Sequence, residues 1–252
     1  MLNIMLREKK IFGLIGKNIG YSFSKKFFSK KFDKLNLEKS CEYKNFDLDH
    51  IKDFKTIIKK YNIHGLNVTI PYKEEVLKYL DEIDVHAQKI GAVNTIKVDS
   101  KGFLKGFNTD YIGFYNSIKK NLNNVHKKAL VLGTGGASKA IVYGLKKLQI
   151  QTTIVSRSKA KGCITYKEIN SIVMGDHQII INCTPLGTSP NTSECPDIPY
   201  KLIGKSHLCF DLIYNPDMSQ FLKKSKKNNA SIINGAEMLE QQAEESWKIW
   251  NN

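Results

Sequence analysis

A short apolar segment that runs directly into a glycine-rich turn constrains the fold of this chain more than any other feature. The apolar run Ala129–Leu132 precedes the turn, and a helical pattern follows it to about Leu148. The turn consists of Gly133, Thr134, Gly135, Gly136 and Ala137. Glycines between a strand and a helix let the backbone approach a pyrophosphate at the helix N-terminus. Ser138 occupies the last position of the strict G-x-G-x-x-G pattern. We interpret the segment as a dinucleotide-binding turn; the alternative is a tight turn without a ligand.

Other apolar segments alternate with helical ones along the 252 residues, which leave room for one large or two small domains. After the turn we expect strands at Thr152–Val155, Ile179–Asn182 and Leu208–Leu212 and a helix at Ala236–Trp250. Before it we expect strands at Lys10–Ile15, Cys41–Phe46, Gly65–Ile70, Asn94–Val98 and Leu104–Gly106. We also expect helices at Ser24–Leu35, Leu48–Lys60 and Asp110–Leu122, and a mostly helical stretch at Glu74–Gly91. This alternation predicts an α/β protein whose second half is a doubly wound sheet.

Composition excludes several classes of function. The formal net charge is +15, from 39 Lys and Arg against 24 Asp and Glu. The basic residues are nearly all dispersed lysines, without an Arg-rich stripe or a recognition-helix motif, so we do not expect nucleic-acid binding. The five cysteines contain no C-x-x-C pair and the histidines are scattered, so we expect no metal site. No apolar run approaches the roughly 20 residues of a membrane span. The odd cysteine count, without a signal peptide, favours the reducing cytoplasm.

The segment that ends at Lys73 carries a second candidate site. Pro71 cannot continue a sheet ladder, so the preceding strand should stop there. Asn67, Thr69 and Lys73 then lie near one strand end. A lysine can act as a general acid or base, or as a cation beside an oxyanion. The alternative is an ordinary exposed lysine.

The strand after the glycine turn indicates which dinucleotide is bound. NAD-binding folds usually place Asp or Glu near the end of this strand, about 20 residues on, for the ribose 2′-hydroxyl. Here the strand continues into Ser156, Arg157, Ser158 and Lys159. A guanidinium group flanked by hydroxyls suits a 2′-phosphate, so the sequence favours NADP. A solvated basic turn in a Lys-rich chain is the alternative.

Several further motifs resemble, in order, those of one family, the bacterial shikimate dehydrogenases in their short single-function form. The matching segments are Ile19–Ser24, Gly65–Lys73, Gly91–Thr95, Gly106–Asp110 with Gly113, Gly133–Ala137, Asn182–Gly187, Asp211–Pro216 and Asn234–Ala243. The resemblance covers essentially the whole chain. It implies an NADP-dependent oxidoreductase acting on a CH–OH group, which reversibly reduces 3-dehydroshikimate to shikimate in chorismate and aromatic amino-acid biosynthesis.

The resemblance also implies roles for individual residues and domains. The family's catalytic pair falls on Lys73 and Asp110. Its substrate contacts fall on Ser22, Ser24, Thr69, Asn94, Tyr214 and Gln242, with Asn67 close by, in addition to that pair. Its cofactor contacts fall on the turn 133–137, on Ser156, Arg157, Ser158 and Lys159, and on Thr184, Leu212 and Gly235. The implied domains are a substrate-binding and catalytic α/β domain (1–108), a Rossmann-like NADP-binding domain (109–232) and a C-terminal helix (233–252) that packs back on the first domain.

Simple chemistry is consistent with these roles. In an extended stretch Ser22 and Ser24 would point the same way and could both donate to a carboxylate. Lys73 would protonate the carbonyl oxygen as hydride arrives, and Asp110 would orient its ammonium group, although Asp110 could also serve only as a helix N-cap. Gln242 shares an inward helix stripe with Met238 and Leu239, so its amide needs a partner.

The chain departs from the family at a few positions. Lys25, Phe27 and Phe28 replace a proline and a nearby His-Asn, and Ser156 begins a motif that is commonly Asn-Arg-Thr.

The sequence bears on three alternatives to this family. Arg157 argues against an NAD-dependent quinate/shikimate dehydrogenase, and the presence of Lys73 and Asp110 argues against a non-catalytic sensor on the same fold. Nucleic-acid binding through net charge would need a steep salt dependence of DNA affinity to support it. The sequence does not decide between a monomer and a homodimer.

Overall fold

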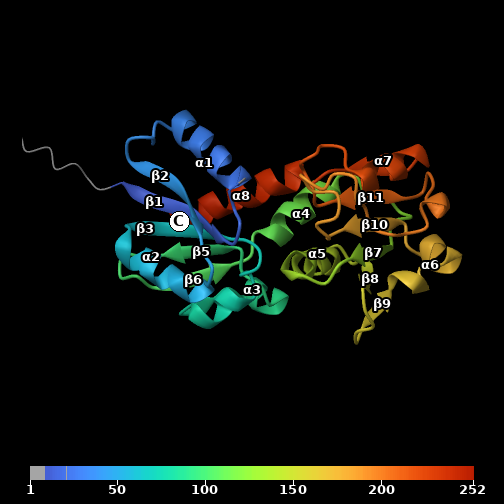
Figure 1. The fold of residues 1–252 in the computed structure, drawn as a ribbon, viewed down its shortest axis with the longest axis horizontal. Helices are drawn as coiled ribbons and strands as arrows, with labels where there is room; N and C mark the ends of the chain where they lie inside the picture. Colours follow the sequence, from blue (N-terminus) through green and yellow to red (C-terminus); the bar gives the residue numbers. More distant parts are fainter. Residues whose placement is uncertain (1–8, 21) are drawn as a thin grey trace, which may run out of the picture. The chain divides into compact units, whose positions relative to one another are not determined.

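The computed structural model describes residues 9–20 and 22–252, which form two compact units (Figure 1). The first unit is Met1–Thr109 with Ala243–Asn252, and the second is Asp110–Gln242. Residues 1–8, which fall in the expected first domain, and Tyr21, in the segment Ile19–Ser24, lie outside the described residues. The expected α/β class is confirmed, because each unit has its own six-stranded sheet within the described residues.

The first unit contains a mixed sheet with strand order β2-β1-β3-β5-β6-β4. Its strands are β1 (Lys10–Gly16), β2 (Cys41–Asp47), β3 (Ile63–Val68), β4 (Glu82–Ile83), β5 (Thr95–Val98) and β6 (Leu104–Phe107). Strand β1 pairs in parallel with β2 and β3, whereas β5 runs antiparallel to β3 and β6. This pairing sets Asn67 of β3 directly opposite Thr95 of β5.

The helices of the first unit are α1 (Phe23–Lys34), α2 (Phe54–Lys60) and α3 (Val85–Ile90), with 3-10 turns at Ile51–Asp53 and Glu75–Tyr79. Helix α1 has the expected length, whereas the helix expected at Leu48–Lys60 begins only at Phe54. Asp47, just before that segment, does not cap a helix. Its carboxylate accepts from the backbone N–H groups of Asn18 (2.9 Å) and Ile19 (3.1 Å).

The stretch Glu74–Gly91, expected to be mostly helical, has helical turns on both sides of a short strand. Strand β4 forms in its middle because it pairs with β6, a contact that is remote in sequence. Asp84 then starts a new helix, since its side chain accepts from the backbone N–H of His86 at 2.9 Å. The strand was not predicted, because nothing in the local sequence indicates its partner.

Two apolar clusters cover the faces of the first sheet. Alternate residues of β1 supply both, with Ile15 in one and Phe12 in the other. The second cluster includes Trp247 and Trp250 from the end of α8 (Ala236–Asn251). Trp250 donates its indole N–H to the carbonyl oxygen of Ile96 at 3.0 Å. It passes so close to β3 that a Cβ added to Gly65 would lie 2.3 Å from Nε1 of Trp250.

The second unit is doubly wound, with an all-parallel sheet in the order β12-β11-β10-β7-β8-β9. Its strands are β7 (Lys128–Leu132), β8 (Gln151–Ser156), β9 (Cys163–Thr165), β10 (Ile179–Asn182), β11 (Leu208–Asp211) and β12 (Ser231–Ile233). Its helices are α4 (Asp110–Lys119), α5 (Gly136–Lys147), α6 (Ser171–Asp176), α7 (Gln220–Lys227) and the first part of α8. The strand order reverses between β7 and β10, and ligands of such sheets bind at the carboxyl edge of that point.

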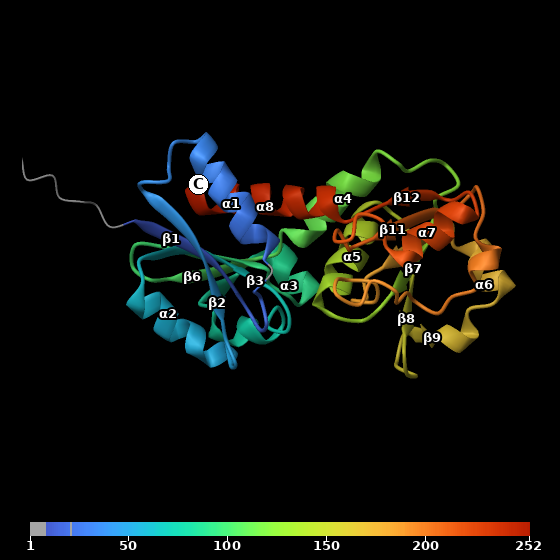
Figure 2. The same cartoon turned by 45° about the horizontal axis from the view of Figure 1, so that its top comes forward.

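Helices α4 and α5 lie side by side in both views (Figure 1 and Figure 2). A Cβ added to Gly144 would lie 2.8 Å from the ring of Phe114, so the glycine permits this close packing. None of the helices formed by residues 9–20 and 22–252 has the length and apolar character needed to cross a membrane.

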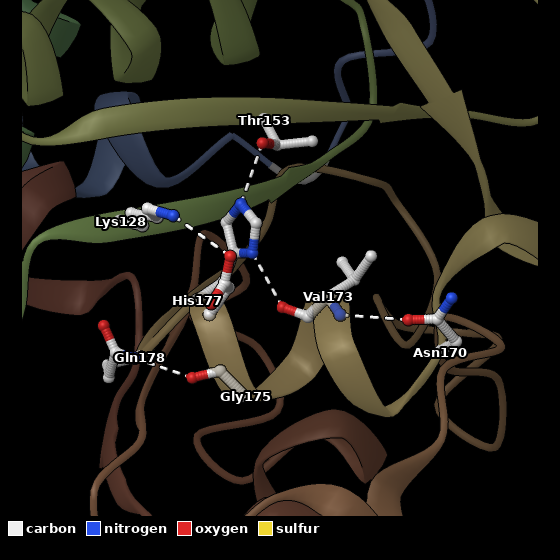
Figure 3. A network of polar contacts seen from close by, with 8 residues as sticks. Lys128, Thr153, Asn170, Val173, Gly175, His177 and Gln178 are labelled. Carbon is white, nitrogen blue, oxygen red and sulfur yellow. Dashed lines mark hydrogen bonds and ion pairs between the residues drawn. The ribbon is translucent and has the colours of Figure 1, made fainter.

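Polar contacts hold α6 against the second sheet, as Figure 3 shows. His177, just after the helix, places Nδ1 2.7 Å from the carbonyl oxygen of Val173 and Nε2 2.8 Å from Oγ1 of Thr153 in β8. Asp176 pairs with Lys128 at the start of β7 at 3.0 Å. These contacts lie away from the carboxyl ends of the strands, where the glycine turn is found.

Candidate active site

Lys73 lies in the turn that follows β3. The strand ends at Val68, and the half-buried Lys73 comes five residues later. Its backbone carbonyl accepts from the N–H of Val93 at 2.7 Å. The turn itself is held by Tyr72, whose hydroxyl donates to the carbonyl oxygen of Leu48 at 2.6 Å. Thr69 is also half-buried, and its N–H donates to Ile15 at 2.9 Å. Both candidate residues therefore stand on a turn with a fixed backbone.

Asn94, next to Val93, fixes the residue that precedes Asp110. Its amide oxygen accepts from the backbone N–H of Thr109 at 2.7 Å, and its Nδ2 donates to Oγ1 of Thr109 at 2.9 Å. Both side chains are almost completely buried. Lys73 is thus hydrogen-bonded to Val93, and the residue before Asp110 is hydrogen-bonded to Asn94, the residue after Val93. Asp110 itself is the first residue of α4 and is 6% exposed.

The two candidate serines stand at the start of α1. Ser22 is the N-cap, and its hydroxyl accepts from the backbone N–H of Lys25 at 3.3 Å. Ser24 is buried in the first helical turn. The expectation that both serines belong to an extended stretch is wrong, because the Ser22 cap starts the helix at Phe23. Ser22 therefore offers its hydroxyl from an extended backbone and Ser24 from a helical one.

The glycine turn has the geometry of an anion cradle in the second unit. Gly133 has φ +112°, a conformation that favours glycine. Gly135 is the N-cap of α5 and has no side chain that could accept hydrogen bonds from the first helical N–H groups. These N–H groups can therefore donate to a phosphate. Thr134 and Gly135 are exposed. Ser138, in the position of the missing third glycine, turns back to donate to the carbonyl oxygen of Gly135 at 2.7 Å.

Strand β8 ends beside this turn. Gly133 donates its N–H to the carbonyl oxygen of Val155 at 2.9 Å, so Ser156 and Arg157 follow at the same edge of the sheet. Ser156 is buried, and its hydroxyl accepts from the N–H of Ser158 at 3.4 Å. Arg157, Ser158 and Lys159 are exposed. No carboxylate occurs in this stretch, so its charges fit a 2′-phosphate.

Strands β10 and β11 add a buried polar group to the same carboxyl edge. Thr184 donates its backbone N–H (3.0 Å) and hydroxyl (2.6 Å) to the amide oxygen of Asn182. The Asn182 amide nitrogen donates to the Asp211 carboxylate at 3.0 Å. Burial raises the pKa of Asp211 from 3.8 to about 6, although Ser219, Ile213 and Asn182 all donate to it. Sequence reasoning named Thr184 but missed the roles of Asn182 and Asp211.

The residues after Asp211 form a tightly fitted backbone. The N–H of Leu212 donates to the backbone carbonyl oxygen of Asn182 at 3.1 Å, and that of Gly235 donates to the backbone carbonyl oxygen of Ile213 at 3.0 Å. A Cβ at Gly235 would lie 2.1 Å from the carbonyl oxygen of Leu212, so only glycine fits there. Tyr214 is half-buried, and burial raises the pKa of its hydroxyl.

Gln242 lies on the inward face of α8, as expected, and is 7% exposed. Its amide donates to the carbonyl oxygen of Leu239 at 2.9 Å. Helix α4 approaches closely here, since a Cβ on Gly113 would lie 2.5 Å from the carbonyl oxygen of Met238. In the described part of the chain, no three His, Cys, Asp or Glu side chains come together as metal ligands would.

Comparison with known proteins agrees with this arrangement. Residues 14–96 match the family described as the shikimate dehydrogenase substrate binding domain. A Clostridium botulinum protein named shikimate dehydrogenase (NADP(+)) is 41% identical over 247 residues, which cover 94% of this chain and 95% of that protein.

Solved structures show the same likeness. A shikimate dehydrogenase in complex with NADP+ has a TM-score of 0.86 at 34% identity, over 96% of this chain and 90% of the other. The Thermus thermophilus shikimate 5-dehydrogenase in complex with NADP(H) and shikimate has a TM-score of 0.84 at 27% identity, over 96% and 93% of the two chains. This chain therefore belongs to the shikimate dehydrogenase family.

Proposed function

We propose that this protein is a shikimate dehydrogenase that uses NADP(H) to interconvert 3-dehydroshikimate and shikimate, a step toward chorismate and the aromatic amino acids. Family membership over nearly the whole chain supports the reaction class. The observation that carries the proposal is the Val93–Asn94 segment, which bonds to Lys73 on one side and to Thr109, next to Asp110, on the other. This segment fixes the backbone at Lys73 and at the residue before Asp110, and the ammonium group of Lys73 and the carboxylate of Asp110 suit acid-base chemistry at a carbonyl.

The first unit supplies the groups that bind substrate in this proposal. Residues 1–108 form the substrate domain, and the helix at 233–252 completes it. Substrate contacts come from Ser22, Ser24, Asn67, Thr69, Lys73, Asn94, Asp110, Tyr214 and Gln242. The two serine hydroxyls suit the substrate carboxylate, whereas the amides and Thr69 suit its ring hydroxyls. Each hydrogen bond from a serine hydroxyl to the charged carboxylate is worth roughly 1.5–3 kcal/mol.

Lys73 and Asp110 move and hold the proton. NADPH, when bound, supplies the hydride that reduces the substrate carbonyl. Lys73 donates a proton from Nζ to the carbonyl oxygen in that direction, and it receives the hydroxyl proton in the reverse direction. Asp110 orients the ammonium group and offsets its charge. Lys73 comes from a turn whose backbone is held by hydrogen bonds, which limits the positions that its ammonium group can take.

Residues 109–232 would hold NADP. The Gly133–Ala137 turn fits the pyrophosphate, because Gly133 has a positive φ and Gly135 leaves the start of α5 open. Arg157, Lys159 and the hydroxyls of Ser156 and Ser158 suit the 2′-phosphate. Thr184, Leu212 and Gly235 border the remaining cofactor surface in this proposal. We also place the protein in the cytoplasm, since its five cysteines are free thiols, as a reducing compartment requires.

A spectrophotometric assay of the purified protein tests the proposal. Shikimate with NADP should give rapid NADPH formation. The kcat/KM with NADP should exceed that with NAD by about tenfold or more, a difference of at least 1.4 kcal/mol in transition-state binding. Faster turnover of quinate with NAD would assign the chain to the NAD-dependent quinate/shikimate enzymes instead. Absence of turnover with all four combinations would refute an oxidoreductase role.

A further inference from the structure

A buried polar cluster lies within the first unit, and the roles assigned above use only part of it. The cluster consists of Tyr43, Asn67, Asn94, Thr95, Thr109 and Ser246. Each of these residues is at most 5% exposed. Asn67 and Asn94 already have proposed substrate roles, whereas Tyr43 of β2 and Ser246 of α8 have none. Burying a polar side chain without a hydrogen-bond partner lowers the stability of the fold, so the hydrogen bonds in this cluster show what its members do.

The Tyr43 hydroxyl sets the orientation of the Asn67 amide. It donates to Oδ1 of Asn67 at 2.8 Å, and burial raises the pKa of Tyr43 far above its ordinary value, so the phenol stays protonated. With Oδ1 held there, Nδ2 of Asn67 faces the other way and donates to Oγ of Ser246 at 3.0 Å. A flipped amide would turn the Tyr43 hydroxyl from donor to acceptor, and its proton would then need another acceptor inside the buried cluster.

Ser246 carries the connection on to Asn94. Its Oγ lies 2.8 Å from Oγ1 of Thr95 and 3.2 Å from Oγ1 of Thr109. The Thr95 hydroxyl donates to Oδ1 of Asn94 at 3.1 Å. The cluster therefore links the amide on β3 to the amide that holds Thr109, the residue before Asp110.

At its other end the cluster reaches the start of α1. The ring of Tyr43 stacks on Phe28 of α1, with centroids 4.7 Å apart and an angle of 11° between the planes. Ser24 also lies beside the Tyr43 hydroxyl and partly offsets the rise of its pKa. Tyr43 thus contacts both the helix that presents Ser22 and Ser24 and the strand that presents Asn67.

We propose that Tyr43 and Ser246 are positioning residues of the substrate site. They keep the two serines that bind the carboxylate, Ser22 and Ser24, correctly placed relative to the side-chain amides that bind the ring hydroxyls. This inference rests on the proposed function. Neither residue acts on the substrate itself; each acts through Asn67. Losing one of these hydrogen bonds should therefore weaken shikimate binding and leave cofactor binding unchanged.

Tyr43→Phe tests the proposal, with Tyr200→Phe as the control. Tyr200 lies half-buried in the second unit, and its hydroxyl donates to the carbonyl oxygen of Pro196 at 2.9 Å, so the control also removes one tyrosine hydrogen bond. The KM for shikimate should rise about tenfold in Tyr43→Phe and less than threefold in Tyr200→Phe. In Tyr43→Phe, kcat and the Kd for NADP should stay within about threefold of wild type.

Combining Tyr43→Phe with Ser246→Ala tests whether both residues act through Asn67. The double variant should raise KM by clearly less than the product of the two single effects, because the second change removes a bond that the first has already weakened. An unchanged KM in Tyr43→Phe, an equal rise in Tyr200→Phe, or independent effects in the double variant would overturn the proposal. A wild-type enzyme that does not oxidise shikimate would instead refute the proposed function, and this inference with it.

Discussion

Asp211 at the end of β11 should titrate near pH 6, well above an ordinary aspartate. Its side chain is fully buried, and it accepts from Asn182 and from the N–H of Ile213, both at 3.0 Å, and from the hydroxyl of Ser219. Burial penalises the carboxylate more than these donors stabilise it, which raises the pKa from 3.8 to about 6. Asp211→Asn keeps the shape and removes the titrating group.

The expected effect on stability has a definite sign and size. Between pH 3.8 and about pH 6 the folded chain holds a proton on Asp211 that the unfolded chain has lost, so the contribution of this group to stability falls as the pH rises. The full shift corresponds to about 3 kcal/mol, at 1.36 kcal/mol for each pH unit. Most of this shift falls between pH 4 and pH 7, so the free energy of unfolding of Asp211→Asn, relative to wild type, should increase by about 2 kcal/mol over that range.

Two measurements check this reasoning. The ¹³C NMR signal of the Asp211 carboxyl, assigned by its loss in Asp211→Asn, should titrate with a midpoint near pH 6. Urea unfolding of both proteins across the same pH range should give the relative change in free energy. Asp176→Asn is the control, because it makes the same substitution at an exposed side chain paired with Lys128, and exposed pairs contribute little to stability. A carboxyl midpoint at or below pH 4, or a pH-independent difference, would refute the argument.

Three other substitutions probe the site. Lys73→Met should lower kcat for shikimate oxidation by about 10²–10⁴-fold with a smaller change in KM, because it removes the general acid-base group. A near-normal kcat in steady-state kinetics would remove Lys73 from the mechanism. Arg157→Ala should weaken NADP binding several-fold to about a hundredfold and leave NAD binding unchanged, which calorimetric titration can measure with the exposed Lys161→Ala as control. Equal losses of affinity for both cofactors would make Arg157 a structural residue. Gly235→Ala should lower the melting temperature and weaken NADP, because its Cβ would lie 2.1 Å from the carbonyl oxygen of Leu212; wild-type values for both would show that the backbone there yields easily.

Local signals predicted the elements that depend on neighbours in sequence. The β7–turn–α5 unit was predictable because an apolar strand, glycines with special backbone needs and a helical period follow one another directly. Strand β10 was predicted with its observed bounds for the same reason, as a short apolar run. The short edge strands β9 and β12 were not predicted, because half-exposed three-residue segments carry little periodicity.

The residues that sequence reasoning missed depend on contacts between distant segments. Asp211 lies in a segment that was noted as an apolar strand and for its resemblance, not for a buried polar role. Its bond to Asn182 arises because β10 and β11 are neighbours, and its bond to Ser219 arises at the start of α7. Tyr43 looked like an ordinary strand residue, since its partner Asn67 is 24 positions away and Ser246 is 179 positions from Asn67. A strand pattern shows which face a hydroxyl occupies, but not which buried amide it meets there.

Helix α8 gives this chain an unusual order of assembly during synthesis. The second unit, Asp110–Gln242, is one continuous stretch and can fold as soon as it leaves the ribosome. The first unit is discontinuous, because Ala243–Asn252 contributes Ser246, Trp247 and Trp250 to its interior. The part of the protein that is translated first is therefore completed last, because Trp250 can pack against Gly65 only after the second unit has been translated.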